Sequence, residues 1–173
     1  MAYTTINNGK LYFNTKLYTG DGSTQSITGV GFQPYWVWIK DRDNVRNHVL
    51  NDAVRGATEN LFSNTDSAET TDTSPLTAFN SDGFTLGNGV KVNGNNINFV
   101  SWNWLAGTSV SGNTSGSGTA KSYSGSVNTD AGFSIITYVG NGTDNHQVPH
   151  HLGAVPKMFI MKNISRASRS WNV

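Results

Sequence analysis

The sequence has 173 residues, of which only 13% are charged, and its formal net charge is +1. Nothing in this charge balance favours nucleic acid or an anionic membrane as a partner. The chain contains no cysteine, which excludes disulfides and thiolate metal sites. No apolar run approaches the ~18 residues of a membrane-spanning helix. The 19 glycines, together with aromatic residues spread through short apolar runs, are typical of short strands joined by many turns.

In chain order, we expect a polar N-terminal arm over residues 1–12, followed by two strands that read as a hairpin-like pair. The strands are Lys16–Thr19 and Tyr35–Ile39. The second run is apolar on both faces, so it suits a strand buried on both sides in the middle of a sandwich. Residues 53–62 are interpreted as two strand segments around Arg55-Gly56, because a glycine inside a helix costs about 1 kcal/mol relative to alanine.

Turn residues predict a series of short strands in the next stretch. Ser81-Asp82-Gly83 separates Leu76–Asn80 from Phe84–Leu86, and an Asp-Gly pair between alternating segments is a strong hairpin signal. A further short strand is expected at Val90–Val92, and a long one at Asn96–Leu105. Regular recurrence of short strands predicts an all-β fold, an antiparallel β-sandwich of jelly-roll or lectin-like type with little or no helix.

The composition changes at residues 107–125, which are almost wholly Gly, Ser, Thr and Asn, with Tyr123 as the only aromatic residue. We expect a linker or a long surface loop here. The β-sandwich domain is therefore assigned to residues 13–106.

The pattern of the first strands returns near the end of the sequence. Tyr138 follows Tyr18 by 120 residues, and the segments around both tyrosines are similar. Residues 126–173 are therefore expected to begin a second, incomplete unit or to pack back on the first. The apolar side chains of Phe159, Ile160 and Met161 would remain exposed unless a longer native protein or a partner covered them.

Three closely spaced histidines are the strongest metal-ligand candidates. They are His146, His150 and His151. Pro149 disfavours the helix that would point two imidazoles in one direction, and no cysteine completes a site. We therefore predict no metal and no cofactor, although a trimer could gather one histidine from each chain. The pair Asp41-x-Asp43 lacks the glycine and the terminal glutamate of a calcium loop.

No arrangement in the sequence indicates catalysis. There is no Gly-x-Ser-x-Gly motif, no cysteine and no phosphate-binding loop. None of the 11 carboxylates is singled out as half of a glycosidase pair. We therefore predict that the protein is not an enzyme.

Aromatic side chains are the remaining candidates for a binding site, because their faces can stack on the C–H faces of sugars. Tryptophans at alternating strand positions are more often core residues, which is the competing interpretation of Trp36/Trp38 and Trp102/Trp104. The candidate contacts with a glycan or a partner are Tyr12, Tyr18, Trp36, Trp102 and Tyr123.

Several ordered blocks carry a family resemblance. They include KLYTGDGSTQSITGVGFQPYWVWIKDR, HVLNDAVRGATENL, FVSWNWLAG and the returning AGFSIITYVGNG. These blocks resemble a repeated β-rich domain of uncharacterised proteins encoded by tailed phages, especially of marine bacteria, and by related metagenomic sequences. The resemblance implies a virion or tail-fibre-like protein and supplies no catalytic residue.

We therefore expect a structural virion protein located in the phage tail, a tail-fibre or tail-tip component whose N-terminal region attaches the appendage to the particle. Its partners would be other virion proteins. A homo-oligomer, such as a trimer, is expected by analogy with fibres, because closed symmetry brings exposed strand faces onto their equivalents. The alternatives are a host-recognition module that binds a host surface glycan, and a capsid decoration protein.

Overall fold

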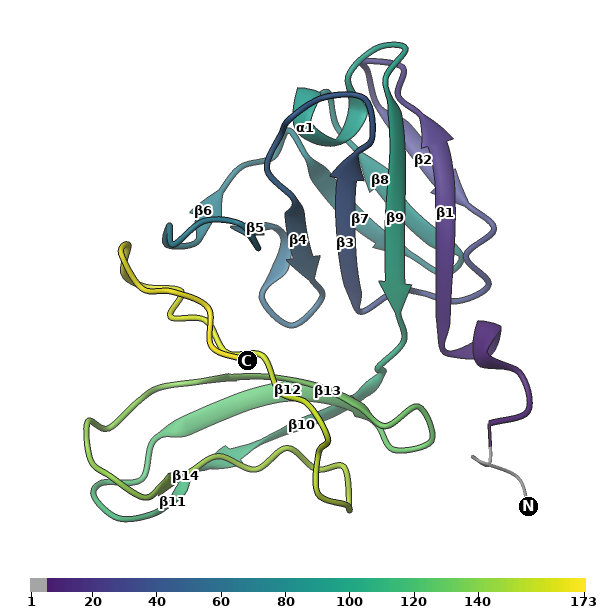
Figure 1. The fold of residues 1–173 in the computed structure, drawn as a ribbon. Coiled ribbons are helices and arrows are strands. Elements are labelled where there is room, and N and C mark those ends of the chain that lie inside the picture. Colours follow the sequence, from purple (N-terminus) through teal and green to yellow (C-terminus); the bar gives the residue numbers. More distant parts are fainter. Residues whose placement is uncertain (1–5) are drawn as a thin grey trace.

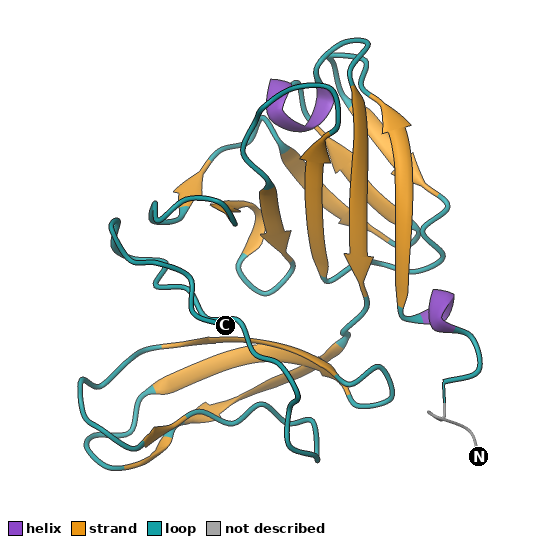
Figure 2. Cartoon of the chain, viewed as in Figure 1, coloured by secondary structure: helices purple, strands orange, loops and turns teal. Residues whose placement is uncertain are grey.

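The computed structural model describes residues 6–173, and its regular secondary structure is almost entirely antiparallel β-strand (Figures 1 and 2). A six-stranded sheet with the order β1-β9-β3-β4-β5-β6 faces a three-stranded sheet with the order β2-β8-β7. The predicted all-β antiparallel sandwich is thereby confirmed. The large sheet contains β1 (Phe13–Thr19), β3 (Trp36–Asp41), β4 (Val49–Asp52), β5 (Gly56–Phe62), β6 (Thr70–Thr71) and β9 (Asn98–Trp104). The small sheet contains β2 (Gln25–Thr28), β7 (Leu76–Asn80) and β8 (Gly83–Leu86).

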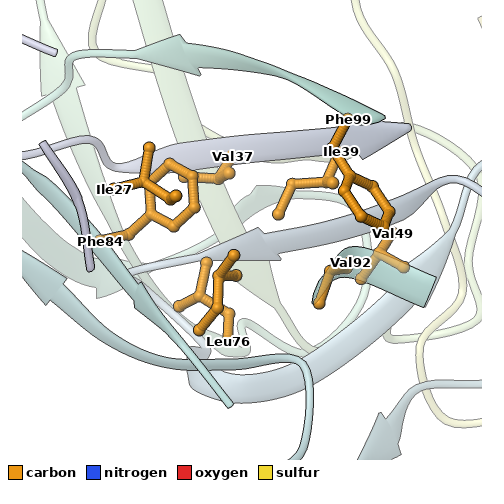
Figure 3. Close-up of a cluster of buried hydrophobic side chains, with 9 residues drawn as sticks. Ile27, Val37, Ile39, Val49, Leu76, Phe84, Val92 and Phe99 are labelled. Atoms are coloured by element: carbon orange, nitrogen blue, oxygen red, sulfur yellow. The ribbon is translucent and has the colours of Figure 1, made fainter. Parts of the chain in front are cut away.

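The hydrophobic core fills the space between these two sheets. It is closed at the top of Figure 1 by the single-turn helix α1 (Val90–Asn93). Burying an aliphatic or phenylalanine side chain of this kind stabilises the fold by about 1.5–3 kcal/mol. The buried cluster, most of which is labelled in Figure 3, consists of Ile27, Val37, Ile39, Val49, Leu76, Phe84, Leu86, Val92 and Phe99.

The hairpin-like pair predicted at the start of the chain is wrong, because β1 and β3 are not neighbours. Strand β9 lies between them and pairs with both, so Trp104 is opposite Phe13 on one side and Trp36 on the other. The intervening β2 belongs to the small sheet. The pairing of β1 and β3 with β9 is therefore long-range, which turn chemistry near the N-terminus does not encode.

Strand β3 is central in its sheet, but only one of its faces lies in the core. Val37 and Ile39 are completely buried, whereas Trp36 and Trp38 are half-buried on the opposite face. The prediction of a strand buried on both sides is therefore corrected. The small sheet covers only the inner face of the large sheet, so the tryptophans point outward.

Buried asparagines hold the loops that surround the core. The side chain of Asn93 has no exposure, and its Oδ1 accepts the backbone N–H of Asp21 at 3.0 Å. Its Nδ2 donates to the carbonyls of Ser23 at 2.6 Å and Gly87 at 2.8 Å. One amide group thus joins three separate parts of the chain at the end of the sandwich.

Two further buried asparagines, Asn51 and Asn60, hold the irregular end of β4 and β5, where the strand register shifts. Asn51 donates through Nδ2 to the carbonyls of Ala57 and Glu59 and to Oδ1 of Asn60, at 2.9, 3.1 and 2.9 Å. Because buried polar groups are costly when unpaired, these bonds favour one arrangement of the bulged strands.

The short strand predicted at Val90–Val92 is a helical turn. The N–H groups of Val92 and Asn93 both donate to the carbonyl of Gly89. The apolar–polar–apolar pattern of three residues is too short to distinguish a strand from one turn of helix. The turn directs Val92 into the core, where it is completely buried.

The linker predicted at residues 107–125 is also wrong, because most of this segment forms strands. A three-stranded sheet has the order β10-β12-β13, and β11 pairs separately with β14. The small side chains of β10 are mainly exposed, and its pairing is made by backbone groups, which composition does not reveal. The strands are β10 (Thr108–Asn113), β11 (Ser115–Gly116), β12 (Ser122–Asn128), β13 (Phe133–Tyr138) and β14 (His146–Gln147).

The segment that corresponds to β3 in the sequence repeat, residues 156–162, does not form a strand. Met161 makes an isolated bridge with Asn172. In the first unit β3 is held between β9 and β4, and the described chain offers residues 156–162 no equivalent pair of neighbours. Met158 and Phe159 are consequently 64% and 58% exposed.

The two ends of the described chain are held by local bonds and by the first unit. In the predicted N-terminal arm, residues 1–5 lie outside the described residues, and Gly9–Leu11 forms the 3-10 turn η1, capped by Asn8. At the other end, the indole N–H of Trp171 donates to the carbonyls of Phe62 at 3.0 Å and Thr65 at 3.1 Å. The C-terminal segment therefore packs back on the sandwich.

We predict that Asn93→Ala lowers the free energy of unfolding by about 2–3 kcal/mol, because buried backbone groups lose their partners. Chemical denaturation followed by fluorescence measures the change. The matched control is Asn95→Ala, since Asn95 is exposed and its replacement should stay within about 0.5 kcal/mol. Equal effects of the two substitutions would contradict the role given to Asn93.

Candidate interaction surface

The outer face of β1, β9 and β3 carries four of the five tryptophans of the chain. We call it the aromatic face, and its side chains form cross-strand rows set by the strand register. The first row is Phe13, Trp104 and Trp36, and the second row is Thr15, Trp102 and Trp38. A third row is Leu17, Val100 and Lys40. In Figure 1 the small sheet lies behind these strands, on their other side.

The first row is packed internally and covered by the second sheet. Trp36 and Trp104 have ring centroids 4.6 Å apart, and Phe13 lies 4.9 Å from Trp104. Phe133 of β13 stacks on Trp36 at 5.9 Å and an interplanar angle of 11°, and on Trp104 at 6.3 Å and 23°. This row is therefore the contact between the sandwich and the sheet that follows it.

Backbone contacts reinforce this junction. The N–H of Gly107 donates to Oγ of Ser126 at 2.8 Å. Ala106 and Val127 are almost completely buried beside it. The chain thus passes from β9 to the second sheet through the short connection 105–107, which these contacts hold in place.

The second row has a different environment, with one of its indoles bonded to a histidine. Trp38 and Trp102 meet edge to face, with centroids 6.0 Å apart at 75°. The indole N–H of Trp38 donates to Nδ1 of His48 at 3.0 Å. Within residues 6–173, the indole N–H groups of Trp36, Trp102 and Trp104 have no protein acceptor.

His48 is neutral in this arrangement. Burial lowers the pKa of His48 below its ordinary value, and the positive charge of Lys40 lowers it further. Since Nδ1 accepts a hydrogen bond from Trp38, the ring proton is carried by Nε2. The imidazole therefore presents a second N–H donor next to the second row.

The ammonium group of Lys40 is directed to the edge of the aromatic face. Its Nζ donates to the backbone carbonyls of Asp41 and Asn44. The remaining third-row side chains, Leu17 and Val100, are apolar, and Leu17 is 64% exposed. The face consequently combines flat rings and N–H donors with a single charge, the Lys40 ammonium at its edge, which donates to backbone carbonyls.

The Asp41-x-Asp43 pair is structural. Asp41 has a fully buried side chain that accepts N–H bonds from Asp43 and Asn44 and pairs with Nε of Arg46 at 3.0 Å. Burial acts to raise the pKa of Asp41, but the hydrogen bonds from Asn44 and Asp43 and the charge of Arg46 hold it below its ordinary value. Asp43 accepts bonds from the backbone and side chain of Asn98.

The predicted contact residues fall into two groups. Trp36 and Trp102 lie on the aromatic face, in the first and second rows. Tyr18 faces inward, where its hydroxyl donates to the carbonyl of Val92 at 2.7 Å, and burial followed by the charge of Asp41 raises its pKa. Tyr123 is only 8% exposed. Tyr12 is half-buried and follows η1.

Sequence reasoning left out Trp38, Trp104 and His48 as contacts. The period-two spacing of Trp36/Trp38 and Trp102/Trp104 does place two tryptophans on one side of each strand. Which side faces solvent depends on where the small sheet packs. Nothing in the sequence places His48 beside Trp38.

The three clustered histidines have three separate partners. Nε2 of His146 lies 2.6 Å from Oγ1 of Thr114, and Nε2 of His151 lies 2.9 Å from the hydroxyl of Tyr123. Nδ1 of His150 accepts the N–H of Leu152 at 3.1 Å. Across residues 6–173, no three His, Asp or Glu side chains are grouped to hold a metal ion.

A pocket of about 340 Å³ lies between β5 and β6 on one side and α1 on the other. The ammonium of Lys91 sits 4.5 Å from the ring centroid of Phe62 and covers its face. Asp72 is the only carboxylate in its lining, whereas glycoside hydrolysis ordinarily needs two.

Within the described residues, no helix has the length and apolar character needed to traverse a bilayer.

Comparison with known proteins identifies one family. The family described as "Domain of unknown function (DUF7483)" matches residues 8–173. No curated protein and no solved structure matches the chain. The match spans both the sandwich and the sheet that follows it.

We predict that protonation of His48 destabilises the fold. The loss of stability begins as the pH falls through about 6.5, the ordinary pKa of histidine, and continues toward the lower pKa of His48 in the folded protein. The unfolded chain binds more protons in this window, so stability rises with pH and is lost on acidification. Nuclear magnetic resonance titration should give His48 a pKa below 6.5. Denaturation at about pH 7.5 and about pH 5.5 should show a smaller difference in His48→Gln than in the wild type. An elevated pKa would refute the assignment.

Proposed function

The chain belongs to the DUF7483 family, a domain of unknown function, and from the resemblance of its sequence blocks together with its structure we propose that it is a structural component of a tailed-phage particle, in a tail fibre or tail tip. The observation that carries this proposal is the junction at the first aromatic row. There Phe133 of the second sheet stacks on Trp36 and Trp104 of the sandwich, so the two parts pack directly against each other. Direct packing of consecutive units is what we expect of a stiff appendage whose role is structural.

The sequence repeat supports an assembly of successive units. Phe133 follows Phe13 by 120 residues and occupies the same position in β13 that Phe13 occupies in β1. Both phenylalanines contact Trp104. Phe13 reaches this row within its own sheet, whereas Phe133 reaches it from the sheet that follows, so the row is shared by two neighbouring units.

The phage setting rests on the resemblance of the ordered sequence blocks. In this proposal the N-terminal region attaches the appendage to the particle, and other virion proteins are its partners. A homo-oligomer, such as a trimer, would cover the apolar side chains left exposed at Met158 and Phe159. Capsid decoration is the alternative location.

A second candidate function is recognition of a host surface glycan, with attachment to the host as its role. The observation that favours it is the second aromatic row, whose tryptophans are half-buried and whose Trp102 indole N–H has no acceptor in residues 6–173. Such a surface can bind a ligand without any chemical reaction. Both candidates describe a non-enzymatic virion protein.

We predict that the protein copurifies with intact phage particles and lies on the tail. Immunogold electron microscopy with an antibody to residues 6–106 tests this location. Gold on the tail or its appendages is the expected outcome, and gold over the head would move the assignment to capsid decoration. Particles without gold, with the antibody shown to bind the isolated protein, would remove the virion proposal.

We also predict that Phe133→Ala loosens the junction between the two units. A half-buried phenylalanine replaced by alanine should cost about 1–3 kcal/mol of local stability. The expected result is faster proteolysis near residues 105–107 and a change in tryptophan fluorescence, because Trp36 and Trp104 lose their cover. Phe159→Ala is the control, since Phe159 is 58% exposed. Unchanged proteolysis in Phe133→Ala would contradict the junction.

A further inference from the structure

We propose that the second and third rows of the aromatic face bind a neutral glycan chain, with Trp102 as its stacking residue and His48 as a hydrogen-bond donor. This inference rests on the glycan-recognition candidate and names its site and ligand class. It does not depend on where the protein sits in a virion. The argument has three steps: the accessible rings, the donors and the absence of charge.

The first step concerns access. Phe133 stacks on the first row, but no aromatic ring from the second sheet contacts Trp38 or Trp102 within the described residues. Thr15 and Leu17 beside them are exposed. The open part of the face runs along the strands for about 7 Å from the second to the third row. It therefore offers room to an elongated ligand.

The second step concerns hydrogen bonding. The Trp102 indole N–H has no protein acceptor within residues 6–173, and the neutral His48 ring presents Nε2–H nearby. Burying these donors under an apolar protein surface would leave them unpaired at a cost. A sugar supplies hydroxyl acceptors at its edges and C–H groups on its faces. Its chemistry thus fits both the rings and the donors, as in ligand sites with a few placed polar groups.

The third step concerns charge. Lys40 is the one ionised side chain in the three rows, and its ammonium is bonded to the carbonyls of Asp41 and Asn44. Asp41 itself is fully buried and paired with Arg46. An anionic polysaccharide would meet one cation in the three rows, the Lys40 ammonium that two backbone carbonyls hold at the edge, and a cationic one would meet no carboxylate there. The ligand that matches this face is uncharged.

The test uses the chain of 173 residues and a panel of soluble neutral and anionic polysaccharides. Affinity electrophoresis detects binding, and tryptophan fluorescence titration measures it. Trp102→Ala removes the stacking ring. Thr15→Glu places a charged side chain opposite Trp102 without entering the core, so it tests the site should Trp102→Ala fail to fold. Trp171→Phe is the control. Trp171 does not belong to the aromatic face, and its indole N–H is bonded to the end of β5 and the loop that follows it.

The expected result is binding of at least one neutral glycan, weakened at least about tenfold by Trp102→Ala and Thr15→Glu and retained by Trp171→Phe. Absence of neutral-glycan binding, or binding that survives in both face variants, would overturn the proposal. Binding of anionic polymers alone would overturn it too. A dimer that both face variants abolish would assign the surface to self-association. None of these outcomes alters the test of location on the virion.

Discussion

The position of β9 between β1 and β3 is the constraint on which the rest of the structure depends. Its inner side chains include the buried Phe99 and Asn103, and its outer side chains include Trp102 and Trp104. One strand therefore supplies both the core and the aromatic face. Because its last residue precedes the buried Ala106, it also determines where the second sheet begins. A change in its register by one residue would exchange the two faces.

Several charged side chains of this protein act mainly to hold loops and strand ends in place through hydrogen bonds and ion pairs. The carboxylate of Asp82 accepts the amides of Gly29 and Gly31, and hydrogen bonds from Gly31 and Gly29 lower its pKa. Arg55 bridges Asp52 and Glu69 across the end of the large sheet. Side chains that would be candidates for chemistry in a charged cleft are here committed to loops and bulges.

The fold class could be predicted from the sequence, because turn residues and alternation are local signals. The hairpin at Ser81-Asp82-Gly83 was predicted correctly for this reason, with β7 and β8 on either side. The insertion of β9 could not be predicted, since it pairs residues about 85 positions apart in sequence. Composition misled at residues 107–125, where backbone pairing forms strands from Gly and Ser. The outward direction of Trp38 required knowledge of which face the small sheet covers.

The two copies of the repeated segment show that the burial and the bonding partners of a side chain depend more on its packing environment than on the local sequence. Tyr18 and Tyr138 occupy equivalent positions, yet Tyr18 bonds to the buried turn at Val92 while Tyr138 is 41% exposed. Strand β1 has β9 as its neighbour, whereas β13 pairs with β12. Two similar strand sequences thus pair with different neighbours. That tolerance lets β13 turn its Phe133 onto the first aromatic row, which becomes the junction with the second sheet, whereas no aromatic ring of that sheet contacts the second row within the described residues.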